Sequence, residues 1–219
     1  MDQIREARID VAAALRLAAR FDMQEGICNH FSYMVPGRND CFLVNPQGLH
    51  WSEVTASDLL LIGDDGLLIE GDAPPEPTAF FIHWRIHHGL PHARVVLHTH
   101  MPYATAITSI AGGRLEAINQ KAVGRFGERV AYDDDFNGFA LDEVEGVRMM
   151  RALGNKSVRV MPPASARNSP SMRSNSNGNA DAATSCTIAS GCPASPRKPA
   201  NGRRRSPAEN ASASLWRAP

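Results

Sequence analysis

Apolar residues at the start of the chain recur every three or four positions, as they do on one face of an α-helix. The members of this series are Ile4, Ala7, Val11, Leu15, Ala18 and Phe21. This spacing predicts an amphipathic helix over residues 4–21, with its apolar face turned toward a core. Gly26 then ends the turn that follows the helix.

Residues 29–35 change to a period of two, which is typical of a β-strand with two different faces. The alternation puts His30, Ser32 and Met34 on one face and Phe31, Tyr33 and Val35 on the other. Short apolar runs at 41–44, 57–62, 95–98 and 130–132 predict further strands. We therefore expect a sheet whose strands carry helices between them.

Three more segments carry helix signals. Thr78 is a predicted N-cap after Glu76-Pro77, and that helix continues to His88 before Gly89. Pro102 suits the first turn of a helix over 103–110, and residues 142–153 form another helix that stops before a glycine. Short strands that alternate with helices predict an α/β domain built in layers.

The composition changes near residue 160. Beyond it Ser, Pro, Ala, Asn and Arg dominate, and eight of the 15 prolines lie there. Such a segment offers too little apolar surface to offset the entropy lost on ordering. We expect a domain over 1–160 and a disordered tail over 161–219. A GC-rich gene read out of frame yields the same composition, so we hypothesise that the tail is frameshifted and the domain incomplete at its C-terminus.

Charge and hydropathy exclude several classes of partner. The formal net charge is +0, which argues against a nucleic acid or an anionic membrane as partner. No apolar run approaches the ~20 residues of a membrane span, and no signal-peptide core is found, so we expect a cytoplasmic protein. The arginines at 203–205 are either a nucleic-acid patch or a solvated charge run, and the lack of interleaved aromatics favours the latter. No two of the four cysteines form a CxxC pair, and we expect Cys28 and Cys41 to be buried.

His98 and His100 carry the clearest chemical signal. They lie two positions apart at the end of an apolar strand, so the strand period puts both imidazoles on one face. Two imidazoles placed in this way can share one metal ion. The spacing alone leaves open that they are two unrelated histidines, because this pattern is short.

Five sequence blocks, in order, resemble the class II aldolase/adducin family. They are Gly26-Ile27-Cys28-Asn29-His30-Phe31-Ser32, 42–48 with 55–59, Glu76-Pro77-Thr78-Ala79 up to His83, 95–106 around the two histidines, and Val130-Ala131-Tyr132. The resemblance implies a three-layer α/β/α domain with a central, mainly antiparallel sheet. It also implies a zinc-dependent (or other divalent-metal-dependent) lyase-type function, a small and possibly phosphorylated hydroxy-carbonyl substrate, and a homo-oligomer, commonly a tetramer.

The resemblance also assigns roles to individual residues. His98 and His100 are two of the family's three metal ligands, and a glutamate is its acid–base group. Asn29 and Ser32 match a turn that donates to an anion, and Gly48 matches a second turn whose backbone approaches it. Plain turn capping is the other interpretation of Asn29 and Ser32.

Two departures from the family pattern put activity in doubt. Ala79 occupies the position of the family's glutamate, and Glu76, one helical turn earlier, is the available substitute. The third histidine of the family lies beyond residue 160, where this chain has none. His30 and His83 are candidates to replace it. We assign no role to the remaining histidines, His50, His87, His88 and His92.

These departures keep two other interpretations open. Ala79 favours a non-catalytic, adducin-like binding module, whereas the tail favours an impaired product of a frameshifted gene. Asp133, Asp134 and Asp135 form either a carboxylate cluster near the site or, as their mutual repulsion favours, a solvated acidic loop. The substrate itself cannot be identified from the sequence.

Overall fold

The computed structural model describes residues 3–73, 75–110, 112–135, 140–160 and 186–190. Within these ranges the strands form one sheet in the order β4-β3-β2-β1-β5-β8-β7-β6. Only β6 and β7 pair in parallel, so the sheet is mainly antiparallel, as predicted. The strands are β1 His30–Met34, β2 Cys41–Val44, β3 Leu60–Gly63, β4 Leu68–Glu70, β5 Val95–Thr99, β6 Val130–Tyr132, β7 Val158–Val160 and β8 Cys186–Ser190.

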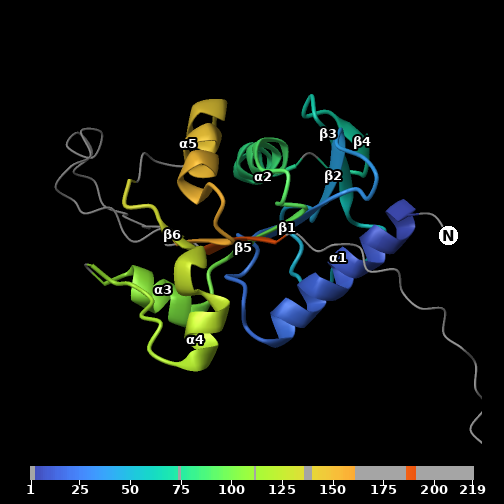
Figure 1. Cartoon of the computed structure of the whole chain (residues 1–219). Coiled ribbons are helices and arrows are strands. Elements are labelled where there is room, and N and C mark those ends of the chain that lie inside the picture. The colour runs from blue at the N-terminus through green and yellow to red at the C-terminus, as the bar shows by residue number, and fades with distance from the viewer. Residues whose placement is uncertain (1–2, 74, 111, 136–139, 161–185, 191–219) are drawn as a thin grey trace, which may run out of the picture.

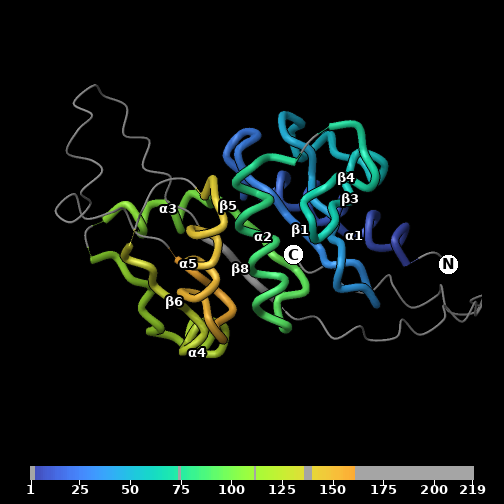
Figure 2. The backbone as a smooth tube through the Cα atoms, turned by 90° about the horizontal axis from the view of Figure 1, so that it is seen from above, coloured from blue at the N-terminus to red at the C-terminus, as the bar shows by residue number. Residues whose placement is uncertain are grey.

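Helices cover both faces of the sheet and make three layers (Figure 1). Helices α2 and α5 lie on one face, and α1, α3 and α4 lie on the other (Figure 1). Seen from above, α2 and α5 run side by side (Figure 2); α2 lies against β1 and β5, and α5 lies against β6 and β7. The helices are α1 Gln3–Arg20, α2 Pro77–Gly89, α3 Pro102–Thr108, α4 Gln120–Arg125 and α5 Glu143–Leu153, with a short 3-10 turn, Gly127–Arg129. None of the described helices combines the length and apolarity needed to cross a bilayer.

The alternation in β1 sorts its side chains as the sequence predicts. Phe31 packs in a cluster with Leu15 of α1 and Trp51, whereas Met34 packs with Ala79 of α2. His30 and Ser32 share the face of Met34 and so meet the histidines of α2. The strand period therefore carries polar side chains into the layer between the sheet and α2.

Strand β8 lies in the segment for which we predicted a disordered tail. Its backbone pairs with β5 on one side and β7 on the other, both antiparallel, and so joins the two halves of the sheet. The remaining residues of 161–219 lie outside the described residues. The domain boundary at 160 and the frameshift therefore stay predictions.

Several local expectations need correction. The N-cap of α2 is Glu76, whose carboxylate accepts from the Ala79 amide at 2.7 Å, and not Thr78. Cys28 is exposed, whereas Cys41 is buried as expected. Strands β4, β7 and β8 and helix α4 are absent from the predicted elements, because each is short or lacks a clear period.

Candidate metal centre

The register of the sheet brings the first two histidines together. His30 of β1 lies directly opposite His98 of β5 in the antiparallel ladder. Their rings meet edge to face with centroids 4.5 Å apart. Both are buried on the α2 side of the sheet, 4% and 8% exposed, so they face each other away from bulk water.

His98 and His100 point at each other, as the strand period predicts. Their Nε2 atoms are 3.2 Å apart. Two Zn–N bonds of about 2.0–2.1 Å at a tetrahedral angle would hold the nitrogens about 3.3–3.4 Å apart. This pair of imidazoles therefore fits one divalent ion with almost no rearrangement.

Glu25 fixes the orientation of His100. Its carboxylate oxygen Oε2 accepts a short hydrogen bond from His100 Nδ1. A carboxylate that accepts from one ring nitrogen orients the imidazole and leaves the other nitrogen, Nε2, free to bind a metal ion. No local pattern in the sequence indicates this role for Glu25, because 75 residues separate it from His100.

His83 of α2 also belongs to this cluster of histidines. His30, His83 and His98 offer ligand atoms that all lie within 4.8 Å of one another, and this group could hold a metal ion. His30 Nδ1 and His83 Nε2 are 2.6 Å apart. His83 also lies on the α2 face that packs on β1, and it is 0% exposed.

Burial keeps these histidines neutral. It lowers the pKa of His30 to about 4, against the opposing effect of the Glu76 carboxylate. Burial, together with neighbouring histidines, holds the pKa of His83 and of His98 well below the ordinary value. Neutral imidazoles keep a lone pair, so at neutral pH the cluster can take a cation without first losing protons.

Ser32 and His87 continue the cluster beyond His83. The Ser32 hydroxyl lies 2.5 Å from His83 Nδ1 and 2.7 Å from His87 Nε2. Nδ1 of His87 lies 2.7 Å from the Ala93 carbonyl oxygen, and burial lowers the pKa of His87 to about 4. We assigned His87 no role from the sequence. The four-residue spacing from His83 on one helix was the available signal.

The carboxylate nearest the expected acid–base position belongs to Glu76. Ala79 is buried in an apolar cluster with Met34 and offers no charge there. Oε2 of Glu76 lies 4.0 Å from His30 Nε2, while it caps α2 through the Ala79 amide. Glu76 therefore borders the histidine cluster from the N-terminus of the helix.

The three residues predicted to bind an anion differ in whether their polar groups already have partners within the protein. Asn29 is buried, its Nδ2 lacks a partner, and its Oδ1 accepts from the Glu25 amide at 2.7 Å. Ser32 is engaged by the two α2 histidines. Gly48 is exposed and has φ +84°, a conformation that favours glycine. Asn29 thus retains a free donor, and the Ser32 hydroxyl is occupied within the protein.

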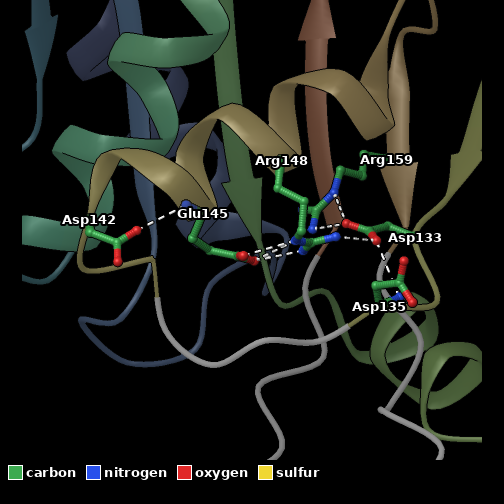
Figure 3. A network of polar contacts seen from close by, with 6 residues as sticks. All are labelled: Asp133, Asp135, Asp142, Glu145, Arg148 and Arg159. Carbon is green, nitrogen blue, oxygen red and sulfur yellow. Dashed lines mark hydrogen bonds and ion pairs between the residues drawn. The ribbon is translucent and has the colours of Figure 1, made fainter. Parts of the chain in front are cut away.

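The acidic segment after β6 is not simply a solvated loop. Asp133 is buried, and its carboxylate accepts from Arg148 Nη1 at 2.6 Å and from Arg159 Nε at 2.8 Å (Figure 3). Arg148 also makes hydrogen bonds to Glu145 on the same helix (Figure 3). Asp134 and Asp135 are exposed, as expected for such a loop. Asp133 is therefore not solvated: its two arginine partners are Arg148 of α5 and Arg159 of β7.

Comparisons with known proteins agree with this fold. A solved aldolase II superfamily protein from Pseudomonas syringae is 36% identical, with TM-score 0.68, over 74% of this chain and 65% of that one. A solved L-fuculose 1-phosphate aldolase from Glaciozyma antarctica is 25% identical, with TM-score 0.63, over 72% and 61%. An adducin-related protein of Schizosaccharomyces pombe is 30% identical over 70% of this chain and 48% of its own length.

This chain therefore spans less than two thirds of each of these relatives. The match to a family model is nevertheless broad. The Class II Aldolase and Adducin N-terminal domain model matches residues 9–162, which include the whole histidine cluster. The chain therefore belongs to the class II aldolase and adducin N-terminal domain family.

Proposed function

We propose that this domain binds a divalent metal ion, zinc in the first instance, through His98 and His100. We further propose that it acts as a lyase-type enzyme on a small hydroxy-carbonyl compound. The observation that carries the proposal is the 3.2 Å separation of the two Nε2 atoms of His98 and His100, which adjoin the buried histidines His30 and His83. In such a site a divalent ion supplies Lewis-acid polarisation of a carbonyl or hydroxyl oxygen.

Other residues of the chain would orient the ligands, bind the substrate and transfer a proton. Glu25 orients His100 through its Nδ1. Asn29 has a buried, unpartnered Nδ2 that could donate to an anionic group of the substrate, such as a phosphate. Gly48, with its open surroundings, would let the backbone approach the same group. The Glu76 carboxylate, 4.0 Å from His30 Nε2, is the candidate to move a proton.

Zinc analysis and an aldol-cleavage assay test this proposal. The purified full-length chain should retain close to one zinc per protomer after gel filtration, and the His98→Ala/His100→Ala variant should retain none. Equal zinc in both proteins would contradict the proposal. Glu76→Gln should lower turnover of a cleaved ketose phosphate by about 10²–10⁴-fold if Glu76 is the acid–base group.

Ala79, which is buried and carries no carboxylate, supports a second candidate function, a non-catalytic, adducin-like binding module. The absence of a carboxylate at this helix position removes the family's acid–base group. A chain that binds zinc but cleaves none of a panel of ketose phosphates, even when Ala79 is replaced by Glu, would favour this alternative. Recovery of cleavage in Ala79→Glu would favour the enzyme.

The assembly and location of the protein extend the same proposal. We also propose that the protein is a homo-oligomer, which the family resemblance supports, and that it is cytoplasmic. Multi-angle light scattering of the purified chain would measure the oligomer directly, and a single-protomer mass would exclude it.

A further inference from the structure

The family's third histidine is missing from this chain, yet the cluster contains more imidazoles than the proposed pair. His30, His83 and His87 lie on the same side of the sheet. His30 contacts His83 directly, and Ser32 joins His83 to His87. The donors and acceptors along this series can be assigned one after another. The assignment decides which nitrogen still has a lone pair to offer.

The series starts at a backbone carbonyl, which can only accept. Nδ1 of His87 lies 2.7 Å from the Ala93 oxygen, so Nδ1 carries the proton and donates. In the neutral ring Nε2 is then an acceptor. Ser32 lies 2.7 Å from this Nε2 and donates its single hydroxyl proton to it. The hydroxyl of Ser32 has no second proton to give.

The next contact is therefore oriented toward Ser32. His83 Nδ1, 2.5 Å from the same hydroxyl, must donate to it, and His83 Nε2 is left as an acceptor. His30 Nδ1 lies 2.6 Å from that nitrogen and donates to it. The lone pair of His83 is thus used inside the protein, which removes His83 from the set of metal ligands.

His30 is the end of the series. Because Nδ1 of His30 carries the proton, its Nε2 is bare. Oε2 of Glu76 lies 4.0 Å from this Nε2, beyond hydrogen-bond distance but close enough for its negative charge to favour a cation there. His30 also faces His98 across the β1–β5 ladder, with ring centroids 4.5 Å apart.

We infer that His30 is a further metal ligand of this chain, through Nε2, beside His98, with which it shares a group of close ligand atoms, and that Ser32, His83 and His87 are positioning residues that fix its tautomer. The inference rests on the proposed metal function. A ligand that donates its other ring nitrogen to a fixed acceptor is the usual arrangement in metal sites. Here that acceptor is another imidazole, held in place by a hydroxyl and a backbone carbonyl.

The proton positions assigned along this series of histidines can be tested without any variant. Long-range ¹H–¹⁵N NMR of the metal-free full chain distinguishes a protonated from a bare ring nitrogen. We expect His30, His83 and His87 all to carry the proton on Nδ1. A protonated Nε2 on His30 in the metal-free protein would overturn the inference, whatever the variants do.

Metal titration then tests the ligand. The His30→Asn variant can keep a donor close to the Nδ1 position but has no atom at Nε2. With Co²⁺ as probe we expect more than about a 100-fold loss of affinity and a changed visible spectrum, because the coordination of the ion changes. His92→Ala, which removes an exposed histidine, is the matched control and should bind Co²⁺ as the wild type does.

The positioning residues should have a smaller effect. Ser32→Ala should lower Co²⁺ affinity by about 10–100-fold, the range found for partners of ligating histidines. Ser32→Thr, which restores a hydroxyl, should recover most of the affinity. A merely structural role for Ser32 would lower the stability of the apo-protein in both variants without this rescue.

The outcomes separate the inference from the function on which it rests. If His98→Ala/His100→Ala abolishes Co²⁺ binding but His30→Asn binds as tightly as the wild type, the proposed function stands and the role of His30 is refuted. If the wild type itself binds no Co²⁺ or Zn²⁺, both are refuted. Loss of binding in His30→Asn with the wild-type melting temperature of the apo-protein supports both.

Discussion

Asp133 illustrates how one buried carboxylate depends on its partners. Its side chain is 3% exposed and lies against Arg159, which is 1% exposed, and Arg148. Burial raises the pKa of the Asp133 carboxyl, but hydrogen bonds and charges from the two arginines outweigh it and lower the pKa below 3.8. The ion pairs hold β7 and α5 to the end of β6, so their contribution is to stability.

Replacing this carboxylate should be costly. Asp133→Asn leaves the Arg159 guanidinium buried without its charged partner, and we expect the free energy of unfolding to fall by about 3–5 kcal/mol. Urea unfolding followed by circular dichroism measures this change. Asp134→Asn is the matched control, because Asp134 is exposed and pairs with Arg114 at the surface, where about 0–1 kcal/mol is expected. Equal losses in the two variants would contradict the burial argument.

The same carboxylate predicts a pH dependence. Its pKa is lower in the folded chain than the ordinary 3.8, so its stabilisation is complete above that value and is lost as the pH falls through it toward the folded pKa. The difference in unfolding free energy between the wild type and Asp133→Asn should be constant from about pH 5 to 8 and shrink below about pH 4. A difference that grows on acidification would have the wrong sign.

At the scale of elements, α2 and α5 approach each other through a glycine. A Cβ built on Gly146 of α5 would lie 2.5 Å from the Phe81 carbonyl oxygen of α2. That oxygen belongs to the backbone and cannot turn away, so a larger residue would push the helices apart. Since α2 carries His83 and His87, the close approach also helps to hold the histidine cluster on the sheet.

Gly146→Ala should therefore destabilise the domain despite the better helix propensity of alanine. We expect a loss of about 1–3 kcal/mol from overpacking, measured by thermal unfolding. Gly124→Ala in α4 is the control, because nothing lies within 4 Å of the added Cβ. That variant should gain about 0.5–1 kcal/mol from reduced backbone entropy. A stabilised Gly146→Ala variant would show that α5 is free to shift.

Many of the helices and strands could be predicted from the sequence, because the spacing of apolar residues determines local structure. The two faces of β1 followed from the alternation, and the pairing of His98 with His100 followed from their spacing. His87 and Asp133 were misjudged because their partners, Ser32 and Arg159, lie 55 and 26 residues away. The cap of α2 had a usable signal, since Pro77 at the first helical position places the cap at Glu76.

For the whole molecule, continuity of the sheet depends on β8. Its backbone pairs with both β5 and β7, so it connects the histidine-bearing strands to the pair β6–β7. No period or composition signal in the sequence indicated this segment, because its pairing is entirely long-range. The side-chain contacts of the histidine cluster, by contrast, come from residues 25–100, although the backbone of His98 lies opposite Thr187 of β8 in the ladder.

A proline in β8 tests this connection. Ile188 pairs with Leu97 and Val158, and Ile188→Pro removes a backbone donor between two strands. We expect a loss of about 1–3 kcal/mol and faster hydrogen exchange in β6 and β7 than in β2 and β3. Ile188→Val keeps the donor and should behave as the wild type. Unchanged exchange in Ile188→Pro would mean that β8 does not join the sheet in solution.

The position of β8 in the chain also bears on biosynthesis. Of the two neighbours of β5, β1 is translated before it, whereas β8 is translated roughly ninety residues after it. At about 5–20 residues per second this leaves the open side of β5 unpaired for roughly 4–20 seconds in every nascent chain. During that interval the strand is a target for chaperones or for the same strand of a neighbouring nascent polypeptide, and slow-codon placement before β8 would lengthen the exposure.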